Sequence, residues 1–136
     1  MDTERQPENA QGTTGRNRNV VPVKVLFSPD ANEVYLRLNR ESGRLKASKS
    51  LLRAIDNKIE LVRQNFLYGA PIAKALIPEE YREMYGATNL FHVKLPLFWR
   101  MLYSIEDGTG GVEIVAFILD ILDHPSYDKK FGYKRR

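Results

Sequence analysis

The apolar positions in the first half of the chain predict one strand followed by two helices. Apolar residues alternate over Val20–Phe27, as they do in a half-buried strand. Ser28 and Pro29 then supply an N-cap and a first helical residue, and apolar residues at helical spacing continue to Arg40. A second helical stripe covers Lys46–Asn65. Because such stripes must be buried, we expect the two helices to pack on a sheet.

The middle of the chain has no strong period. Lys58 and its charged neighbours fall largely outside the stripe of the second helix, and we interpret them as a solvated face. Tyr68–Ile72 is typical of a turn, and Glu79–Glu83 predicts one helical turn. We expect no catalytic cluster in this part of the chain.

The second half predicts three more strands. Leu90–Leu95 and Trp99–Ile105 both alternate, and Pro96–Phe98 between them fits a three-residue hairpin loop. After a second loop at Glu106–Gly111, the residues from Val112 to about Leu119 are apolar on both parities, which is typical of a central strand covered on both faces. The order β-α-α-β-β-β predicts an α+β domain, with the helical hairpin on one face of a mostly antiparallel sheet and a basic C-terminal segment.

Composition divides the chain into a tail and one domain. Residues 1–19 are almost free of apolar side chains, so we expect a disordered polar tail. Residues 20–136 suffice for a single core. The chain has no cysteine and only two histidines, which argues against thiolate chemistry and a zinc site. It begins with no apolar leader and contains no run long enough to span a bilayer. We therefore expect a cytoplasmic protein with no membrane segment and no small-molecule cofactor.

Positive charge gathers at the end of the chain. Five cations lie within Tyr127–Arg136 against Asp128 alone, and aromatic residues lie among them. This mixture favours a single-stranded nucleic acid, whose phosphates meet the cations and whose bases stack on the rings. A solvated basic end with its aromatic residues packed on the core is the alternative.

The predicted hairpin brings cations together. A three-residue loop sets Lys94 opposite Arg100, with side chains roughly 5 Å apart at Cβ, and leaves His92 on the same face with no acid. Such a surface suits a phosphate, which Arg100 can hold by a bidentate fork. The alternative is that Lys94 and Arg100 snorkel or pair with Asp120, Asp123 or Asp128.

Two acid–base candidates follow the last strand. The imidazole of His124 can take or give a proton near neutral pH. Tyr127, three residues later, is a phenol beside cations and can act as an acid, or as a base if its pKa is lowered. The alternative for His124 is a structural cap at the strand end.

These segments together resemble the RelE/ParE superfamily of toxins from type II toxin–antitoxin systems. The resemblance covers about Val23 to Tyr133. Phe91–Leu95 and Trp99–Tyr103 are similar to the family's basic strand, turn and Tyr-Arg-hydrophobic-Tyr segment. His124–Tyr127 resembles its closing His-Arg-x-x-x-Tyr motif, although Pro125 stands where that motif has Arg.

The resemblance implies a ribosome-dependent mRNA endoribonuclease that inhibits translation. In RelE-like members the ribose 2′-hydroxyl attacks the adjacent phosphate in the ribosomal A site and leaves a 2′,3′-cyclic phosphate. Lys94 and Arg100 would bind the scissile phosphate and its developing charge, and His124 or Tyr127 would transfer protons. The residues implied to bind RNA are His92, Lys129, Lys130, Phe131 and Lys134. The implied partners are the ribosome with its mRNA and a small, acidic antitoxin that covers the basic surface.

Two other functions fit the same fold. ParE-like members lack the ribonuclease residues and inhibit gyrase, and an inactive relative would only bind RNA or a partner. The fold alone does not choose among the three.

Overall fold

The structure, a computed structural model, describes residues 22–111 and 113–132. The predicted tail, residues 1–19, and Lys134 lie outside the described residues. The strands are β1 (Val23–Phe27), β2 (Ala70–Pro71), β3 (Phe91–Lys94), β4 (Arg100–Asp107) and β5 (Ile114–Leu122). The helices are α1 (Pro29–Glu41), α2 (Lys46–Gln64), α3 (Glu79–Tyr85) and α4 (His124–Phe131), with short 3-10 turns η2 (Lys74–Leu76), η3 (Pro96–Phe98) and η4 (Thr109–Gly111).

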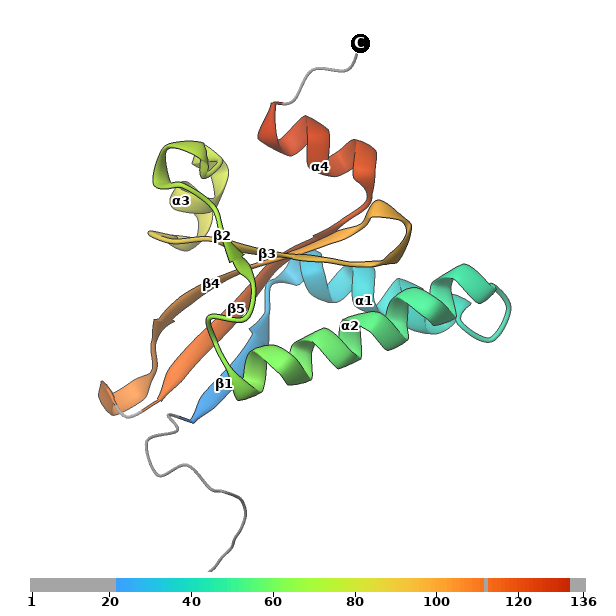
Figure 1. The fold of residues 1–136 in the computed structure, drawn as a ribbon, viewed down its shortest axis with the longest axis horizontal. Coiled ribbons are helices and arrows are strands. Elements are labelled where there is room, and N and C mark those ends of the chain that lie inside the picture. The colour runs from blue at the N-terminus through green and yellow to red at the C-terminus, as the bar shows by residue number, and fades with distance from the viewer. Residues whose placement is uncertain (1–21, 112, 133–136) are drawn as a thin grey trace, which may run out of the picture.

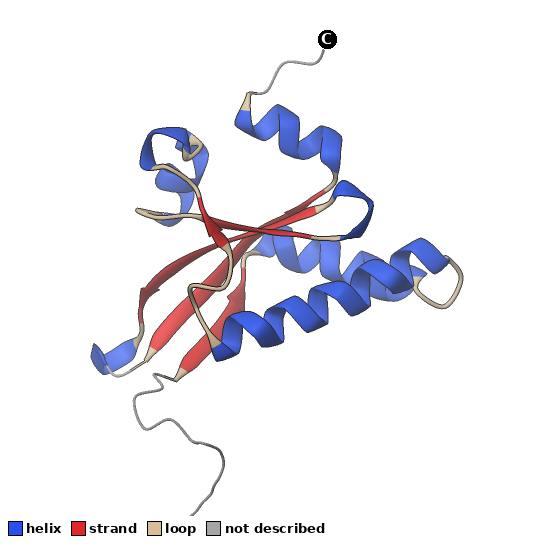
Figure 2. Cartoon of the chain, viewed as in Figure 1, coloured by secondary structure: helices blue, strands red, loops and turns tan. Residues whose placement is uncertain are grey.

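The five strands form one sheet in the order β1-β5-β4-β3-β2. β1 runs parallel to β5, and every other neighbouring pair is antiparallel. In Figure 1, the hairpin of α1 and α2 lies on one side of the sheet, and α3 and α4 lie on the other. The prediction of an α+β domain with a helical hairpin on a mostly antiparallel sheet is confirmed. The prediction placed its helices on one face of the sheet, and the structure adds α3 and α4, which cover part of the second face (Figure 2).

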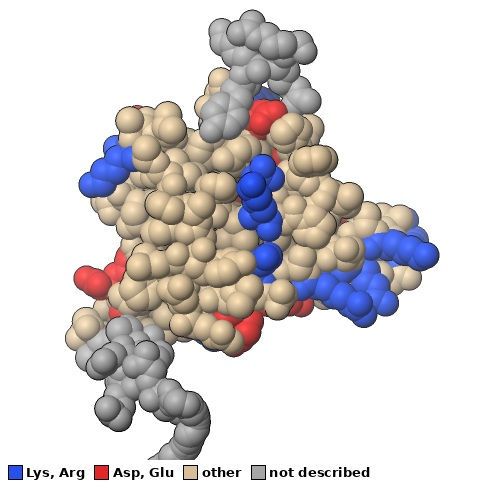
Figure 3. Space-filling view, in the orientation of Figure 1, with Lys and Arg blue, Asp and Glu red and all other residues tan. Residues whose placement is uncertain are grey.

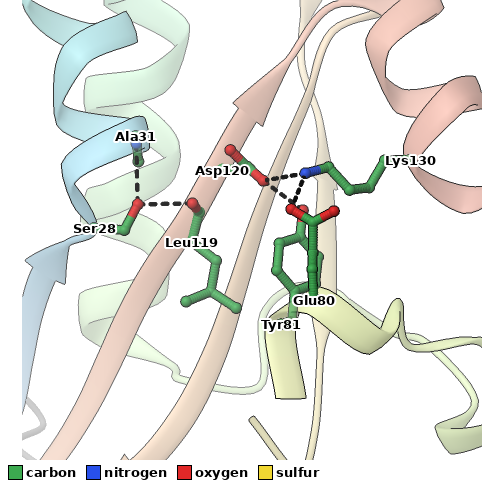
Figure 4. Close-up of polar contacts among 7 residues, drawn as sticks. All are labelled: Ser28, Ala31, Glu80, Tyr81, Leu119, Asp120 and Lys130. Atoms are coloured by element: carbon green, nitrogen blue, oxygen red, sulfur yellow. Dashed lines mark hydrogen bonds and ion pairs between the residues drawn. The ribbon is translucent and has the colours of Figure 1, made fainter. Parts of the chain in front are cut away.

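Ser28 ties the start of α1 to the centre of the sheet. Its Oγ accepts a hydrogen bond from the amide of Ala31 at 3.0 Å and donates one to the carbonyl of Leu119 at 2.7 Å. Leu119 is the extra residue of a β-bulge, because Leu102 pairs with Asp120 while the next residue of β4 pairs with Ile118. The N-cap predicted from the sequence is therefore confirmed, and it also satisfies a bulge carbonyl (Figure 4).

The main core lies between the sheet and the α1–α2 hairpin. Both helices bury the apolar stripe that the sequence predicts, and Tyr103 and Met101 of β4 meet it from the sheet. β5 is buried on both of its faces, which confirms the prediction of a covered central strand. Its strand reaches Leu122, three residues beyond the predicted end at about Leu119.

A smaller core lies on the opposite face, beneath α3 and α4. It joins Tyr81 of α3 and Tyr127 of α4 to Leu102 and Leu119 of the sheet. The basic segment is thus partly helical rather than a plain tail. Asp123 caps α4 by accepting from the amide of Ser126 at 2.9 Å, and the helix ends at Gly132 in the left-handed region.

Candidate functional site: a cationic face of the sheet

The β3–β4 hairpin has the register that its loop length predicts. Lys94 pairs with Arg100 and His92 with Leu102, and the amide of Leu95 donates to the carbonyl of Trp99 at 2.9 Å. Residues paired across a ladder share a face, so His92, Lys94 and Arg100 lie on the side of the sheet that carries α4. Lys94 is exposed, and the other two are half-buried.

The two paired cations have no carboxylate partner in the described part of the chain. Among residues 22–111 and 113–132, neither Lys94 nor Arg100 forms a salt bridge. The prediction that this face has no acid of its own is wrong, because Asp120 pairs with Leu102 and so shares the face. Its Oδ2 is taken instead by the hydroxyl of Tyr81 at 2.6 Å and by the ammonium of Lys130 at 3.5 Å.

His92 stays neutral on this face. Burial lowers its pKa, and the nearby charges of Arg100 and Lys94 lower it further. Its Nδ1 is buried without a hydrogen-bond partner among the described residues. The imidazole therefore adds a polar ring to the cluster at pH 7 and no positive charge.

Arg100 rests on an aromatic platform supplied by α4. Its guanidinium carbon lies 5.4 Å from the ring centroid of Tyr127, which is 8% exposed. The ring of Tyr127 in turn lies 4.5 Å from that of Phe131. A cation–π contact of this kind holds the guanidinium in place. Its Nη1 also donates to the carbonyl of Trp99 at 3.2 Å, so the remaining N–H groups of the guanidinium are the ones able to meet an anion. Of the two acid–base candidates, Tyr127 is thus a buried support, whereas His124 is more open.

His124 begins α4 beside the β3–β4 turn. Its Nε2 lies 3.3 Å from Oδ2 of Asp128 one helical turn later, and its side chain is 45% exposed. Its ring centroid lies 5.8 Å from that of Phe98. Phe98 is 71% exposed, and both it and Leu97 have left-handed backbone angles, with φ of 64° and 61°. Such angles are uncommon outside glycine, so this turn presents two apolar side chains on a constrained backbone.

The other predicted RNA-binding residues differ in how far they are exposed. Lys130 points inward, where its Nζ contacts Glu80 at 2.5 Å and lies 5.3 Å from the ring centroid of Tyr81. Lys129 is exposed and lines an open pocket of about 420 Å³ together with Glu80, Leu122, Ser126 and Lys130. Phe131 packs against Tyr127.

The positive charge of Lys130 is balanced by the carboxylates of Glu80 and Asp120 (Figure 4). Burial raises the pKa of Asp120, and burial together with Asp120 raises that of the Tyr81 phenol. Burial disfavours the charge on Lys130, but Glu80 and Asp120 outweigh it and raise the pKa of the ammonium. This cluster connects α3, α4 and β5, so it positions the helices around the site.

Lys58 and Tyr68, which the sequence did not single out as site residues, lie beside the cationic face. They line an open pocket of about 300 Å³ with His92 and Lys94 at the edge of β3. Figure 3 shows Lys and Arg side chains in a short column between the positions of α4 and α2. The sequence offers little indication that Lys58 belongs to a site, because helical spacing does not show which residues of the following turn lie next to it.

The described part of the chain was searched for a metal site and for a membrane-spanning helix, and neither was found. No group of three or more His, Cys, Asp or Glu side chains there could hold a metal ion. The helices of the same residues are too short or too polar to cross a lipid bilayer.

Searches against protein-family models, curated proteins and solved structures find no match to this chain.

Proposed function

We propose that this protein is a RelE-like toxin that cleaves mRNA on the ribosome. The observation that carries the proposal is the cross-strand pair of Lys94 and Arg100, which has no counter-charge among the described residues. Two like charges opposite one another destabilise a sheet. An external anion relieves that repulsion, and a phosphodiester presents two oxygens to the planar fork of Arg100.

The proposed reaction needs a charge stabiliser and proton transfer. The ribose 2′-oxygen bonds to the phosphorus while a base takes its proton, and the P–O5′ bond breaks as an acid protonates the leaving oxygen. The products are a 2′,3′-cyclic phosphate and a 5′-hydroxyl. Lys94 and Arg100 would stabilise the extra negative charge in the transition state. His124 is the better placed proton carrier, because it is more exposed than Tyr127 and is held by Asp128.

The other proposed roles concern binding. Lys129 is free of the inner network and would meet RNA phosphates, and the exposed ring of Phe98 would offer a surface for base stacking. Lys130 would stabilise the fold and would not bind RNA, because its ammonium forms ion pairs with Glu80 and Asp120. A small acidic antitoxin would cover the same cationic face in the resting cell.

A non-cleaving member of the same fold is the second candidate. The observation that favours it is the burial of Tyr127 beneath Arg100, which removes one of the two acid–base groups from the surface. Such a protein would arrest growth through gyrase or another partner, or would bind without any arrest.

Induced expression in a bacterial host, with primer extension on an abundant mRNA, separates these functions. We expect wild type to arrest growth and to cut mRNA between codon positions, and Arg100→Ala to do neither while remaining folded. Lys24→Ala is the matched control, because Lys24 is an exposed cation on β1 at the opposite edge of the sheet. Growth arrest with intact mRNA would contradict the nuclease and support the second candidate.

A further inference from the structure

The pocket at the edge of β3 is built from three separate parts of the chain. Lys58 comes from α2, Tyr68 and Gly69 from the turn after it, and His92 and Lys94 from β3. The pocket has a volume of about 300 Å³, and none of the described residues that line it is a carboxylate. Its two charged lining groups are both ammonium ions, so its chemistry is that of an anion site.

The wall of this pocket is anchored to the core. The buried hydroxyl of Tyr103 accepts from the amide of Gly69 at 2.8 Å and donates to the carbonyl of Phe66 at 2.9 Å. Gly69 has no room for a side chain, because a Cβ would lie 2.9 Å from the Tyr103 ring and 3.1 Å from the carbonyl of His92. The turn is therefore held at a fixed distance from β3.

Lys58 is oriented toward this turn. Its Nζ donates to the Tyr68 hydroxyl at 3.1 Å and lies 5.6 Å from the centroid of the same ring. The ammonium has three donors, so two remain for a ligand. Lys94 also lines the pocket and is the cross-strand partner of Arg100.

We propose that this pocket is a second phosphate-binding subsite, and that it holds the RNA phosphate next to the scissile one. The identity of the ligand as RNA rests on the proposed function, whereas the affinity for phosphate rests on the pocket itself. Lys94 joins the two subsites, so consecutive phosphates of one strand would pass from Arg100 to Lys58. The subsite would position the strand and would not take part in bond breaking.

Two binding measurements on the full-length protein test this subsite. The first uses a short single-stranded RNA with 2′-O-methyl riboses, which cannot be cleaved, over a series of salt concentrations. We expect Lys58→Gln to weaken binding roughly tenfold, as for the loss of one hydrogen bond to a charged group. The slope of log affinity against log salt should fall by about 0.7, the value for one phosphate contact on a single strand. Lys24→Gln, with the same change of charge, should leave both unchanged, and Lys58→Arg should keep most of the affinity.

The second measurement uses inorganic phosphate and follows the amide resonances of Gly69 and Ala70. We expect saturable shifts in wild type and in Arg100→Ala, and none in Lys58→Gln. Shifts of this kind in a protein that neither binds nor cuts RNA would overturn the proposed function and leave the phosphate subsite standing. RNA affinity equal in Lys58→Gln and Lys24→Gln, with no phosphate response in wild type, would overturn the subsite.

Discussion

Two charged clusters share one face of the sheet and differ in how their charge is balanced. Lys130, Asp120 and Glu80 meet beneath α3 and α4, where each cation or anion has an opposite charge within reach. Arg100 lies on β4 two residues before Leu102, the cross-strand partner of Asp120, and it faces Lys94 of β3. Neither Lys94 nor Arg100 has an acid partner among the described residues. Position on the face therefore does not decide the role of a charge. A counter-charge inside the fold makes the first cluster structural, and we propose that the second, which has none among the described residues, is a site for an external anion.

The balanced cluster should contribute more to stability than any other charged group discussed. Asp120→Ala leaves the largely buried ammonium of Lys130 with the more exposed Glu80 alone and removes the acceptor of the Tyr81 hydroxyl. We expect the free energy of unfolding to fall by about 3–5 kcal/mol, as when one partner of a buried pair is removed. Urea denaturation measures it.

Asp107→Ala is the control for that loss, because Asp107 is exposed at the far end of β4. It should change stability by no more than about 0.5 kcal/mol. An equally small loss in Asp120→Ala would show that the two clusters do not differ in the proposed way.

The unbalanced cluster should behave in the opposite sense. Lys94→Gln removes one of two facing cations, so we expect the free energy of unfolding at low salt to rise by about 0.2–1 kcal/mol. The gain should shrink at high salt, where exposed charges are screened. Denaturation at low and high ionic strength tests this, and a loss of stability in Lys94→Gln would mean that Lys94 has a partner within the fold.

His92 should give the smallest effect, a dependence of stability on pH. Because its pKa is lower in the folded protein than in the unfolded chain, the stability it contributes is present above the unfolded pKa of about 6.5. That contribution is lost as the pH falls toward the folded pKa. Between about pH 7 and pH 5.5, wild type should therefore lose more stability than His92→Gln. If stability depends on pH in the same way in the two proteins, the pKa of His92 is not lowered in the folded protein, and the prediction is contradicted.

The sequence predicted the parts of this arrangement that depend on local spacing. A three-residue loop and strict alternation were sufficient to pair Lys94 with Arg100, and Ser28 with Pro29 marked the start of α1. Helix α4 was missed because its eight residues are rich in charge and carry little periodic apolar pattern, although Asp123 and Gly132 are ordinary cap residues.

Contacts between distant segments were beyond local patterns. Lys58 looked like part of a solvated face, because only the anchored turn brings Tyr68 against it. Asp120 was predicted to lie outside the strand. In a central strand that is apolar on both faces, no alternating pattern marks the last residue. The bulge at Leu119 then sets Asp120 opposite Leu102, on the face where Tyr81 and Lys130 reach it.

The most direct test of the account is cleavage of mRNA on purified ribosomes by the purified protein. We would compare an all-ribose message with one carrying a single 2′-deoxyribose at the cut position, using wild type and Arg100→Ala. The account predicts a cut with a 2′,3′-cyclic phosphate end only for wild type on the all-ribose message, and a loss of about 10²–10³-fold in Arg100→Ala, as for the removal of one transition-state donor. Intact message with wild type, or equal cleavage by Arg100→Ala, would contradict it.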